Sequence, residues 1–469
     1  MIASDSILLR KNRQHTPGTG MYLCLLIYAL IRLCPWSPPI VDDSLARDPS
    51  WIMALNEGFA NHWHFGSEIA FTYGPYGFLH CPSYHPQTYP WLIGGWLFLA
   101  FVFFDCTWRL MKERGYAPLS LFCCCLAMLE IVSWSRMPIF FTIQLFLLVD
   151  HFYLKKRSRR FWRICRIAIF GEKNRQRIAW SLLIQKLRKT ALIFAFALLP
   201  LIKLTYLASG GLILSVIFLD CLVHRKVPWI IASILGAVLV LWLGAGQLSG
   251  DLIQYLRNGI ESSVGYGRAM ATWETQWFQY VVETASAFLV VTIPILFFKA
   301  ERKRSYYSSL LVGLSLLGLL FVAWKSAFVR YHDAKIAIFT CTALLSVGIL
   351  IPLLNISAIS RKLRRGGAFL IAAAFVAIGV AVNLSSPGFD VLQQTIDRIS
   401  SVPFIQIRAF AGTVTGSDFK KERYEQRLKR IRENNPLPPL VGTVDVLPHD
   451  LMSVIASGLD YQPRPVIQN

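Results

Sequence analysis

The side chains best suited to acid–base chemistry outside the apolar parts of the sequence are carboxylates in residues 41–90. The acids of this segment are Asp42, Asp43, Asp48, Glu57 and Glu68, against a single base, Arg47. A carboxylate beside a bound substrate can accept the proton of an attacking hydroxyl group. We expect Glu57 and Glu68 to be solvated, and we keep them with Asp43 and Tyr73 as secondary candidates for a site.

Residues 48–50, Asp-Pro-Ser, predict the start of a short helix, with Asp48 as its N-cap and proline at the first helical position. An N-cap role alone would also explain Asp48. The apolar positions that follow share one helical face, as expected for a helix in the membrane interface: Trp51, Leu55 and Phe59. Residues 73–79, Tyr-Gly-Pro-Tyr-Gly-Phe-Leu, then contain a Gly-Pro turn that returns the chain towards the bilayer.

Cationic groups gather in a second segment, residues 325–335. Its ionisable residues are Lys325, Arg330, His332, Asp333 and Lys335. Among them the guanidinium of Arg330 is best matched to phosphate, because it offers two parallel hydrogen bonds. A simpler interpretation is an interfacial cluster in which Arg330 pairs with Asp333. Lys203, three residues after Pro200 in an apolar run, is a second phosphate candidate unless its amine extends to the membrane surface.

Histidines offer a third kind of chemistry in the first segment. They are His62, His64, His80 and His85. A His-x-His pair beside a carboxylate can hold a divalent metal. Surface histidines are the more common alternative, and no helical pair four residues apart or cysteine partner supports a metal here. We therefore expect no cofactor.

The composition indicates a membrane protein. Of the 469 residues, 54% are hydrophobic and 16% charged, whereas soluble domains have about 25% charged residues. This excludes a soluble enzyme, a disordered chain and a disulfide-rich secreted module. The net charge of +21 does not favour nucleic acid, because most bases lie in short blocks between apolar runs. We predict an all-α polytopic membrane fold with about eleven spanning helices, at 21–40, 91–109, 117–135, 138–154, 190–207, 209–223, 228–246, 286–299, 307–324, 336–353 and 367–384.

The basic residues also orient the predicted helices. With a cytoplasmic N-terminus, the inside segments carry 29 bases and four acids, as the positive-inside rule requires. Three ionisable residues then fall near the outer ends of helices and border an external cavity: Arg32, Glu130 and Lys203. Three acids fall near the inner ends, where we expect lysine and arginine partners: Asp105, Asp150 and Asp220.

The chain then divides into a cytoplasmic segment 1–20, a transmembrane domain 21–384 and an external tail 385–469. The transmembrane domain has external loops at 41–90 and 247–285. Its basic cytoplasmic loop, 155–189, fits either in-plane helices on the anionic leaflet or an ordinary connector.

In the tail we predict a helix over 418–434, a buried strand and turn over 441–448, and a helix from 449 to 459. Such an α/β-like unit is too small for a core of its own, as in an incomplete domain.

The layout resembles the GT-C superfamily of glycosyltransferases, multispanning enzymes that use polyprenyl-phosphate-linked sugars. Asp48 lies where that family places an acid after its first helix, and residues 73–79 lie where its return segment falls. The pattern departs from the family because proline follows Asp48, while the adjacent acidic pair is Asp42 and Asp43.

The resemblance implies an enzyme of the bacterial inner membrane that transfers a sugar from a polyprenyl-phosphate carrier to an envelope glycan, lipid or protein on the outer face. Asp48 would be the general base. Arg330, with Lys325 or Lys203, would hold the phosphate, and His332 and Asp333 would complete the substrate-binding set. The partners would be the lipid bilayer, the donor and an acceptor that the sequence does not specify, without nucleic acid. Alternatives are an envelope polysaccharide polymerase or ligase, a transporter or flippase of lipid-linked sugars, and a non-enzymatic scaffold.

Overall fold

The protein was analysed as a computed structural model, which describes residues 19–40, 47–112, 136–154, 172–269, 277–302, 305–329, 333–350, 353, 361–385, 404–416, 419–445 and 451–462. Regular structure in this part of the chain is helical, apart from isolated β-bridges. Four helices are long and apolar enough to cross a membrane: Tyr89–Leu110, Leu204–Val223, Trp277–Glu301 and Tyr306–Phe328. Five shorter apolar helices accompany them: Gly20–Leu33, Met137–Tyr153, Trp229–Gly244, Lys335–Leu350 and Gly366–Val380. These helices indicate a membrane protein.

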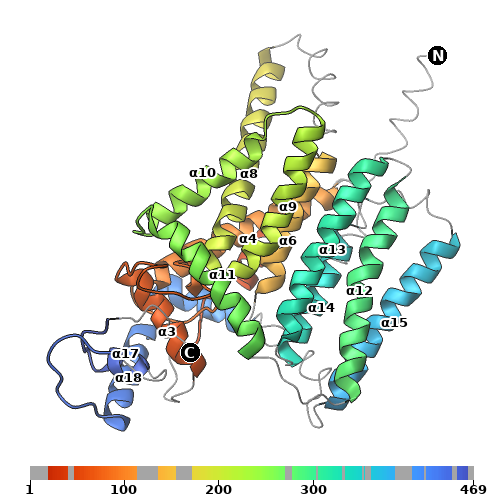
Figure 1. Ribbon diagram of the computed structural model, residues 1–469. Helices are drawn as coiled ribbons and strands as arrows, with labels where there is room; N and C mark the ends of the chain where they lie inside the picture. Colours follow the sequence, from red (N-terminus) through yellow and green to blue (C-terminus); the bar gives the residue numbers. More distant parts are fainter. Residues whose placement is uncertain are drawn as a thin grey trace, which may run out of the picture.

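The helices form a bundle of two groups (Figure 1). The first contains α2 (Thr19–Leu33), α4 (Tyr89–Lys112), α6 (Met137–Val149), the π-helical turn η2 (Asp150–Leu154), α8 (Glu172–Ile202), α9 (Leu204–Val223) and α10 (Trp229–Gly244). The second contains α12 (Trp277–Glu301), α13 (Tyr306–Phe328), α14 (Asp333–Leu350) and α15 (Arg361–Ser385). Contacts of α13 with α9 and of α14 with α6 join the two groups.

Helix α6 lies at the centre of the bundle. All of its residues are buried, and it contacts α4, α8, α9, α13 and α14. An apolar helix without a polar side must be covered all round, which its neighbours achieve. Its side-chain amide, Gln144, donates to the carbonyl of Tyr206 at 2.7 Å and accepts from the Ser209 hydroxyl at 2.6 Å. These bonds hold α6 to α9 where water is not available to satisfy the amide.

The predicted helix positions agree with the structure, with one shift. Helix covers part or most of every predicted span except 117–135, which lies outside the described residues. The joint between spans 190–207 and 209–223 lies earlier than predicted, because α8 ends at Ile202 and α9 begins at Leu204. Residues 172–189 continue into α8 as one helix rather than forming separate in-plane helices. The total of eleven spans and the cytoplasmic N-terminus stay predictions.

One end of the bundle is rich in bases and holds the acids Asp105, Asp150 and Asp220; we call it the basic end. Asp105 Oδ1 lies 2.9 Å from Arg188 Nη2, and Asp150 Oδ1 lies 3.2 Å from Arg109 Nη2. Both predicted pairings with arginine are thus confirmed. Asp220 instead contacts a histidine of η2, with 2.8 Å between its Oδ2 and His151 Nε2.

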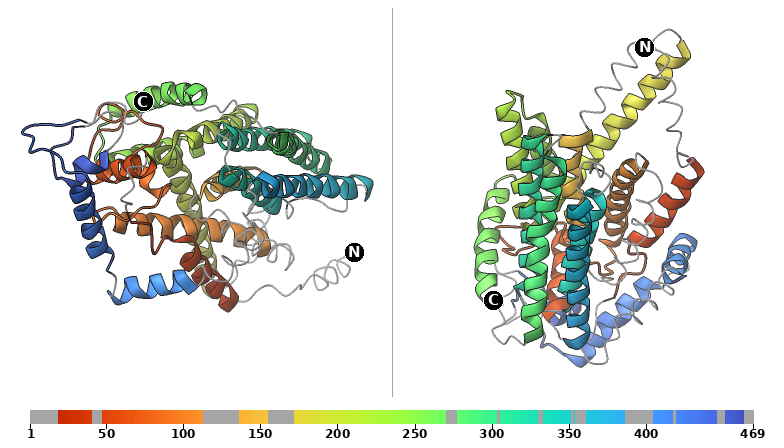
Figure 2. Two further views of the ribbon diagram at one scale, coloured as in Figure 1. Left: turned by 90° about the horizontal axis from the view of Figure 1, so that it is seen from below. Right: turned by 90° about the vertical axis from the view of Figure 1, so that its right-hand side faces the viewer.

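The other end, which we call the loop end, carries the long connections (Figure 2). It contains α3 (Arg47–Ala60), the single turn η1 (Gly77–Leu79), α11 (Asp251–Ala269), and the tail helices 404–415, α17 (Lys420–Asn434) and α18 (Leu451–Ala456). The tail lies along one side of α3, because α18 packs against both α17 and α3.

The tail is helical rather than α/β. Helices α17 and α18 confirm the two helices predicted there, although α18 is shorter than expected. The predicted buried strand is wrong over its described part, 441–445, where Val441 is fully exposed and an isolated bridge pairs Val444 with Tyr461. The tail buries helix side chains against α3 instead, so no sheet is needed to cover its apolar residues.

Candidate functional site

Helix α3 carries the predicted acid. It begins at Arg47, two residues before the predicted first helical position, so Asp48 lies inside the first turn with Pro49 and the predicted N-cap position is wrong. Its apolar face packs on the chain that follows. Leu55 is buried, and the ring of Phe59 meets Phe78 edge-on with centroids 4.8 Å apart. The predicted amphipathic helix therefore exists, and it is held against residues 71–79, which we call the return segment.

The return segment closes the joint between α8 and α9. Carbonyl groups at the end of a helix lack intrahelical partners and need donors from elsewhere. Here the carbonyl of Leu201 accepts from the backbone N–H of Tyr76 at 3.1 Å, and that of Ile202 accepts from the N–H of Gly74 at 3.2 Å. On the other side of the joint, Leu204 donates its N–H to the Thr72 carbonyl at 2.9 Å. The chain between α3 and α4 is therefore built into the helical bundle.

Gly74 is required for this close approach. A Cβ atom at position 74 would collide with the carbonyl oxygen of Leu201 and approach the Tyr255 hydroxyl to 2.8 Å. That hydroxyl donates to the carbonyl of Pro200 at 2.9 Å, so it has little freedom to move. The glycine of the predicted Gly-Pro turn thus serves backbone contact as well as chain reversal.

Lys203 lies at the joint, outside both helices. Its backbone is extended and forms a β-bridge with Tyr73. Its amine donates to the Tyr73 hydroxyl at 2.9 Å and lies 4.5 Å from the centre of the Tyr73 ring. The Cys81 sulfur lies 4.0 Å from the same hydroxyl.

The Lys203 amine has no carboxylate partner among the described residues. Burial lowers the pKa of Lys203 to about 8; the Cys81 thiol acts against this change, and the charge of Lys335 adds to it. A half-buried ammonium beside a second lysine, with a phenol as its side-chain partner in the described part of the chain, is an incompletely compensated charge. The arrangement is suited to an anionic ligand.

A buried, neutral histidine lies next to the joint and contacts α9. His80 is buried, and its Nδ1 lies 3.0 Å from the Tyr206 hydroxyl. Burial lowers the pKa of His80 well below its ordinary value, and the charge of Lys203 acts in the same direction. His80 is therefore neutral, adds no second positive charge beside the lysine, and serves as a packing and hydrogen-bonding group.

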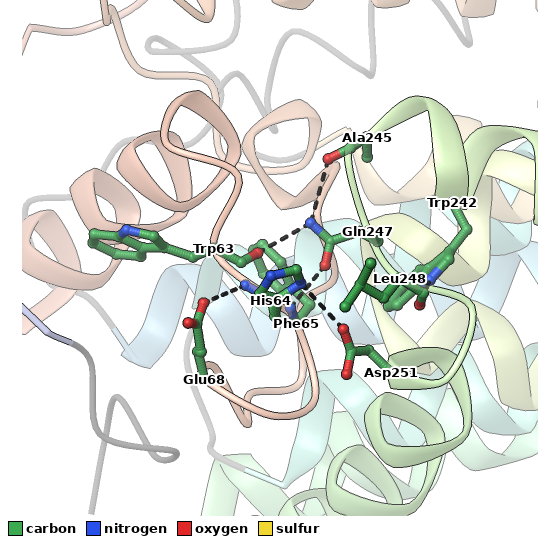
Figure 3. A network of polar contacts seen from close by, with 9 residues as sticks. All are labelled: Trp63, His64, Phe65, Glu68, Trp242, Ala245, Gln247, Leu248 and Asp251. Carbon is green, nitrogen blue, oxygen red and sulfur yellow. Dashed lines mark hydrogen bonds and ion pairs between the residues drawn. The ribbon is translucent and has the colours of Figure 1, made fainter.

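The chain from the end of α10 to the start of α11 holds residues 63–68 in place through polar contacts (Figure 3). Gln247 accepts from the backbone N–H of Phe65 at 2.8 Å and donates to the carbonyl of Trp63 at 3.0 Å. His64 Nδ1 lies 3.1 Å from Asp251 Oδ2, and the His64 N–H donates to the Glu68 carboxylate. We expected Glu68 to be solvated, but its carboxylate accepts a hydrogen bond from the backbone of His64 and so holds the turn before the return segment.

Glu57 occupies the opposite side of α3, which faces the tail. Its carboxylate lies 3.1 Å from His85 Nε2, and 16% of its side-chain surface is exposed, so the expectation of a solvated Glu57 is wrong. The ring of Tyr424 in α17 packs edge-on against His85 with centroids 5.7 Å apart. The tail thus covers this pair and shields it from solvent.

No family model, characterised protein or solved structure matches the chain. The described residues also contain no group of three histidine, cysteine or acidic side chains placed to hold a metal ion. The geometry of the loop end is therefore the feature of the molecule that indicates a function.

The structure brings some of the predicted site residues together. Lys203 and Tyr73 are in direct contact, and Asp48 lies in the first turn of the helix packed on the return segment. Lys325 is exposed in the last turn of α13, and Asp333 begins α14. Three candidates lie outside the described residues: Asp43, Arg330 and His332.

Sequence reasoning named Lys335 in the cation-rich segment but did not link it to Lys203, and it gave no role to Phe71, which stacks on Tyr73. The composition of the cation-rich segment drew attention to Lys335, but it could not show that Lys335 lies near Lys203. Phe71 carried no sequence signal of its own, because aromatic residues are common throughout this interfacial loop.

Proposed function

We propose that the protein is a membrane glycosyltransferase that takes a sugar from a polyprenyl-phosphate carrier and transfers it to an acceptor on the outer face of the membrane. The observation that carries this proposal is the Lys203 amine, half-buried at the loop end and without a carboxylate partner among the described residues. Removing a charge from water is unfavourable unless an opposite charge accompanies it. A phosphate bound in the substrate complex would supply that charge.

The lipid carrier fits the position of this cation. Lys203 joins two apolar helices, so a phosphate at its amine would lie at the end of the bundle while its polyprenyl chain remained in contact with lipid. The positive charges of Lys203 and Lys335 would stabilise the negative charge that develops on the departing phosphate. Arg330 and Lys325 remain further candidates for the same task, with His332 and Asp333 beside them.

Asp48 is the proposed general base. The acceptor hydroxyl attacks the anomeric carbon and forms the new glycosidic bond. The bond from that carbon to the phosphate oxygen breaks, and its electron pair leaves with the phosphate. A carboxylate at position 48, in the first turn of α3, would take the hydroxyl proton.

The cation is tested by binding. In the full-length protein in lipid nanodiscs, Lys203→Met should weaken binding of polyprenyl phosphate by about one hundredfold, the upper range for loss of a charge-assisted hydrogen bond. The control is Lys226→Met, which removes an exposed lysine between α9 and α10 and should leave binding unchanged. Equal binding by the Lys203 variant and the wild type would remove the proposed phosphate site.

The base is tested by turnover. Asp48→Asn keeps the shape of the side chain and removes its basicity, so it should retain donor binding while losing consumption of a polyprenyl-phosphate sugar. Wild-type protein that binds the donor without consuming it, with any acceptor or water, would instead favour movement of lipid-linked sugars. Normal turnover in Asp48→Asn would exclude Asp48 as the base.

A further inference from the structure

Three aromatic rings form a cluster that includes Tyr73, the partner of the Lys203 amine. Trp51 of α3 stacks on Tyr73 with centroids 5.1 Å apart and planes inclined by 25°. Phe71 stacks on the same tyrosine at 5.3 Å and 29°, and its centroid lies 5.8 Å from that of Trp51. Tyr73 is therefore the common member of the cluster, and it is also the residue that holds the lysine.

The three rings differ in exposure. Tyr73 is buried, whereas Trp51 and Phe71 are half-buried and present part of their surface at the loop end. Position 48 precedes Trp51 by three residues, which is close to one helical turn, so it belongs to the same side of α3. The cluster thus contacts the cation through Tyr73, and it includes Trp51, about one helical turn after position 48 of α3.

We propose that Trp51 and Phe71 form the sugar subsite, on which a hexopyranose ring stacks while its phosphate contacts Lys203. This inference rests on the proposed function and names the part of the donor that these rings recognise. Aromatic faces carry partial negative charge, and the C–H bonds on the apolar face of a pyranose carry partial positive charge. The class that fits is a hexopyranose with several C–H bonds aligned on one face.

The chemistry of a glycosyl phosphate requires the aromatic rings and the Lys203 amine to lie close together. A glycosyl phosphate joins its sugar to the phosphate through one oxygen, so the two must bind at neighbouring places. The stacked rings adjoin the tyrosine that Lys203 contacts, which satisfies this requirement. A sugar held there would present its anomeric carbon between the phosphate site and the first turn of α3, where the attacking hydroxyl needs its base.

Two lipids that differ only in the sugar separate this subsite from the phosphate site. Binding of polyprenyl phosphate and of polyprenyl glucosyl phosphate is measured for the full-length protein in lipid nanodiscs. Trp51→Ala should weaken binding of the glucosyl lipid by up to about tenfold and change binding of the bare phosphate lipid by less than about twofold. Lys203→Met should weaken both.

Two further variants control for folding and for general aromatic contact with lipid. Trp51→Phe keeps an aromatic face and should restore most of the affinity for the glucosyl lipid. Trp91→Ala removes a tryptophan of α4 that is 62% exposed and lies outside the cluster, so both affinities should remain unchanged.

Equal loss of both lipids in Trp51→Ala would show that the ring holds the loop or the lipid chain, and it would overturn the sugar subsite. An unchanged affinity for the glucosyl lipid would overturn it as well. Failure of the wild type to bind either lipid would overturn the proposed function itself, which makes the two failures distinguishable.

Discussion

The two ends of the helical bundle differ in whether their buried ionisable side chains have partners of opposite charge. At the basic end Asp105 and Asp150 each contact an arginine, and Asp220 contacts two histidines, His151 and His224. At the loop end the Lys203 amine has a phenol and a ring as its contacts and no carboxylate among the described residues. The acids of the basic end are therefore paired within the chain, whereas the described part of the loop end leaves the charge of Lys203 without an acid beside it.

This difference separates two reasons for placing ionisable groups beside apolar helices. Paired charges connect helices, as Arg188 of α8 does when it reaches Asp105 of α4. A cation left without its opposite charge contributes nothing comparable to folding, because its desolvation is not repaid by an ion pair. Such a group is most readily explained by a ligand that arrives after folding.

The largest expected effect on folding comes from the basic end. Asp105→Asn removes the carboxylate opposite Arg188 and leaves the guanidinium, 32% exposed, without that partner. We expect a loss of about 2–3 kcal/mol, below the 3–5 kcal/mol typical of fully buried pairs because the arginine retains contact with solvent. Lys203→Met should by contrast leave the stability equal or raise it. Thermal unfolding in detergent measures both.

A double variant checks that charge is the cause. Asp105→Asn combined with Arg188→Met removes both charges and should recover part of the lost stability. If Lys203→Met proved as destabilising as Asp105→Asn, the lysine would be a structural group and the contrast between the two ends would fail.

Much of the bundle and part of this contrast could be predicted from the sequence. Apolar runs gave the helix positions, because covering a helix in lipid requires little beyond length and hydropathy. The partners of Asp105 and Asp150 followed from their place beside basic blocks. The sequence placed the acids and bases of the loop end among the site candidates, but which of these residues are in contact could not be inferred from their spacing.

The reason is that the contacts of the loop end are distant in sequence. Tyr73 meets Lys203 only because the return segment pairs with the end of α8, a backbone contact that leaves no side-chain pattern. The strand predicted in the tail is wrong for a related reason. Residues 441–448 contain β-branched side chains, which favour a strand, but a strand needs a partner, and the tail buries Tyr424 and Met452 of its helices instead.

Ligand binding should weaken as pH rises, because the lowered pKa of Lys203, about 8, makes its amine lose its charge near that pH. Between pH 7 and pH 9 the charged fraction falls from about nine tenths to about one tenth, so the affinity for a glucosyl phosphate lipid should fall by up to about tenfold. A phosphodiester does not titrate in this range, so the change reports the protein. Isothermal titration across the pH series measures it.

Lys203→Arg is the matched control for the pH series. Arginine keeps its charge throughout the range, so this variant should lose the pH dependence if it binds the lipid at all. The stability of the ligand-free protein should change with pH in the opposite direction to ligand binding, because the folded and unfolded states bind different numbers of protons. Its unfolded lysine, with a pKa near 10.5, binds more protons than the folded one above pH 8, so stability should rise with pH there. A flat binding profile in the wild type would mean that Lys203 does not meet the phosphate.

The smallest effect is expected from a paired charge at the loop end. Arg257 and Glu261 lie one turn apart on α11 at 3.4 Å, with 79% and 67% of their side chains exposed. Water already solvates both groups, so Arg257→Gln should change stability by less than about 0.5 kcal/mol and leave lipid binding unaltered. Thermal unfolding and the binding assay measure these outcomes together. A larger loss would mean that proximity to the loop end, rather than burial without an opposite charge, makes a cation important there, and Lys203 would lose its special status.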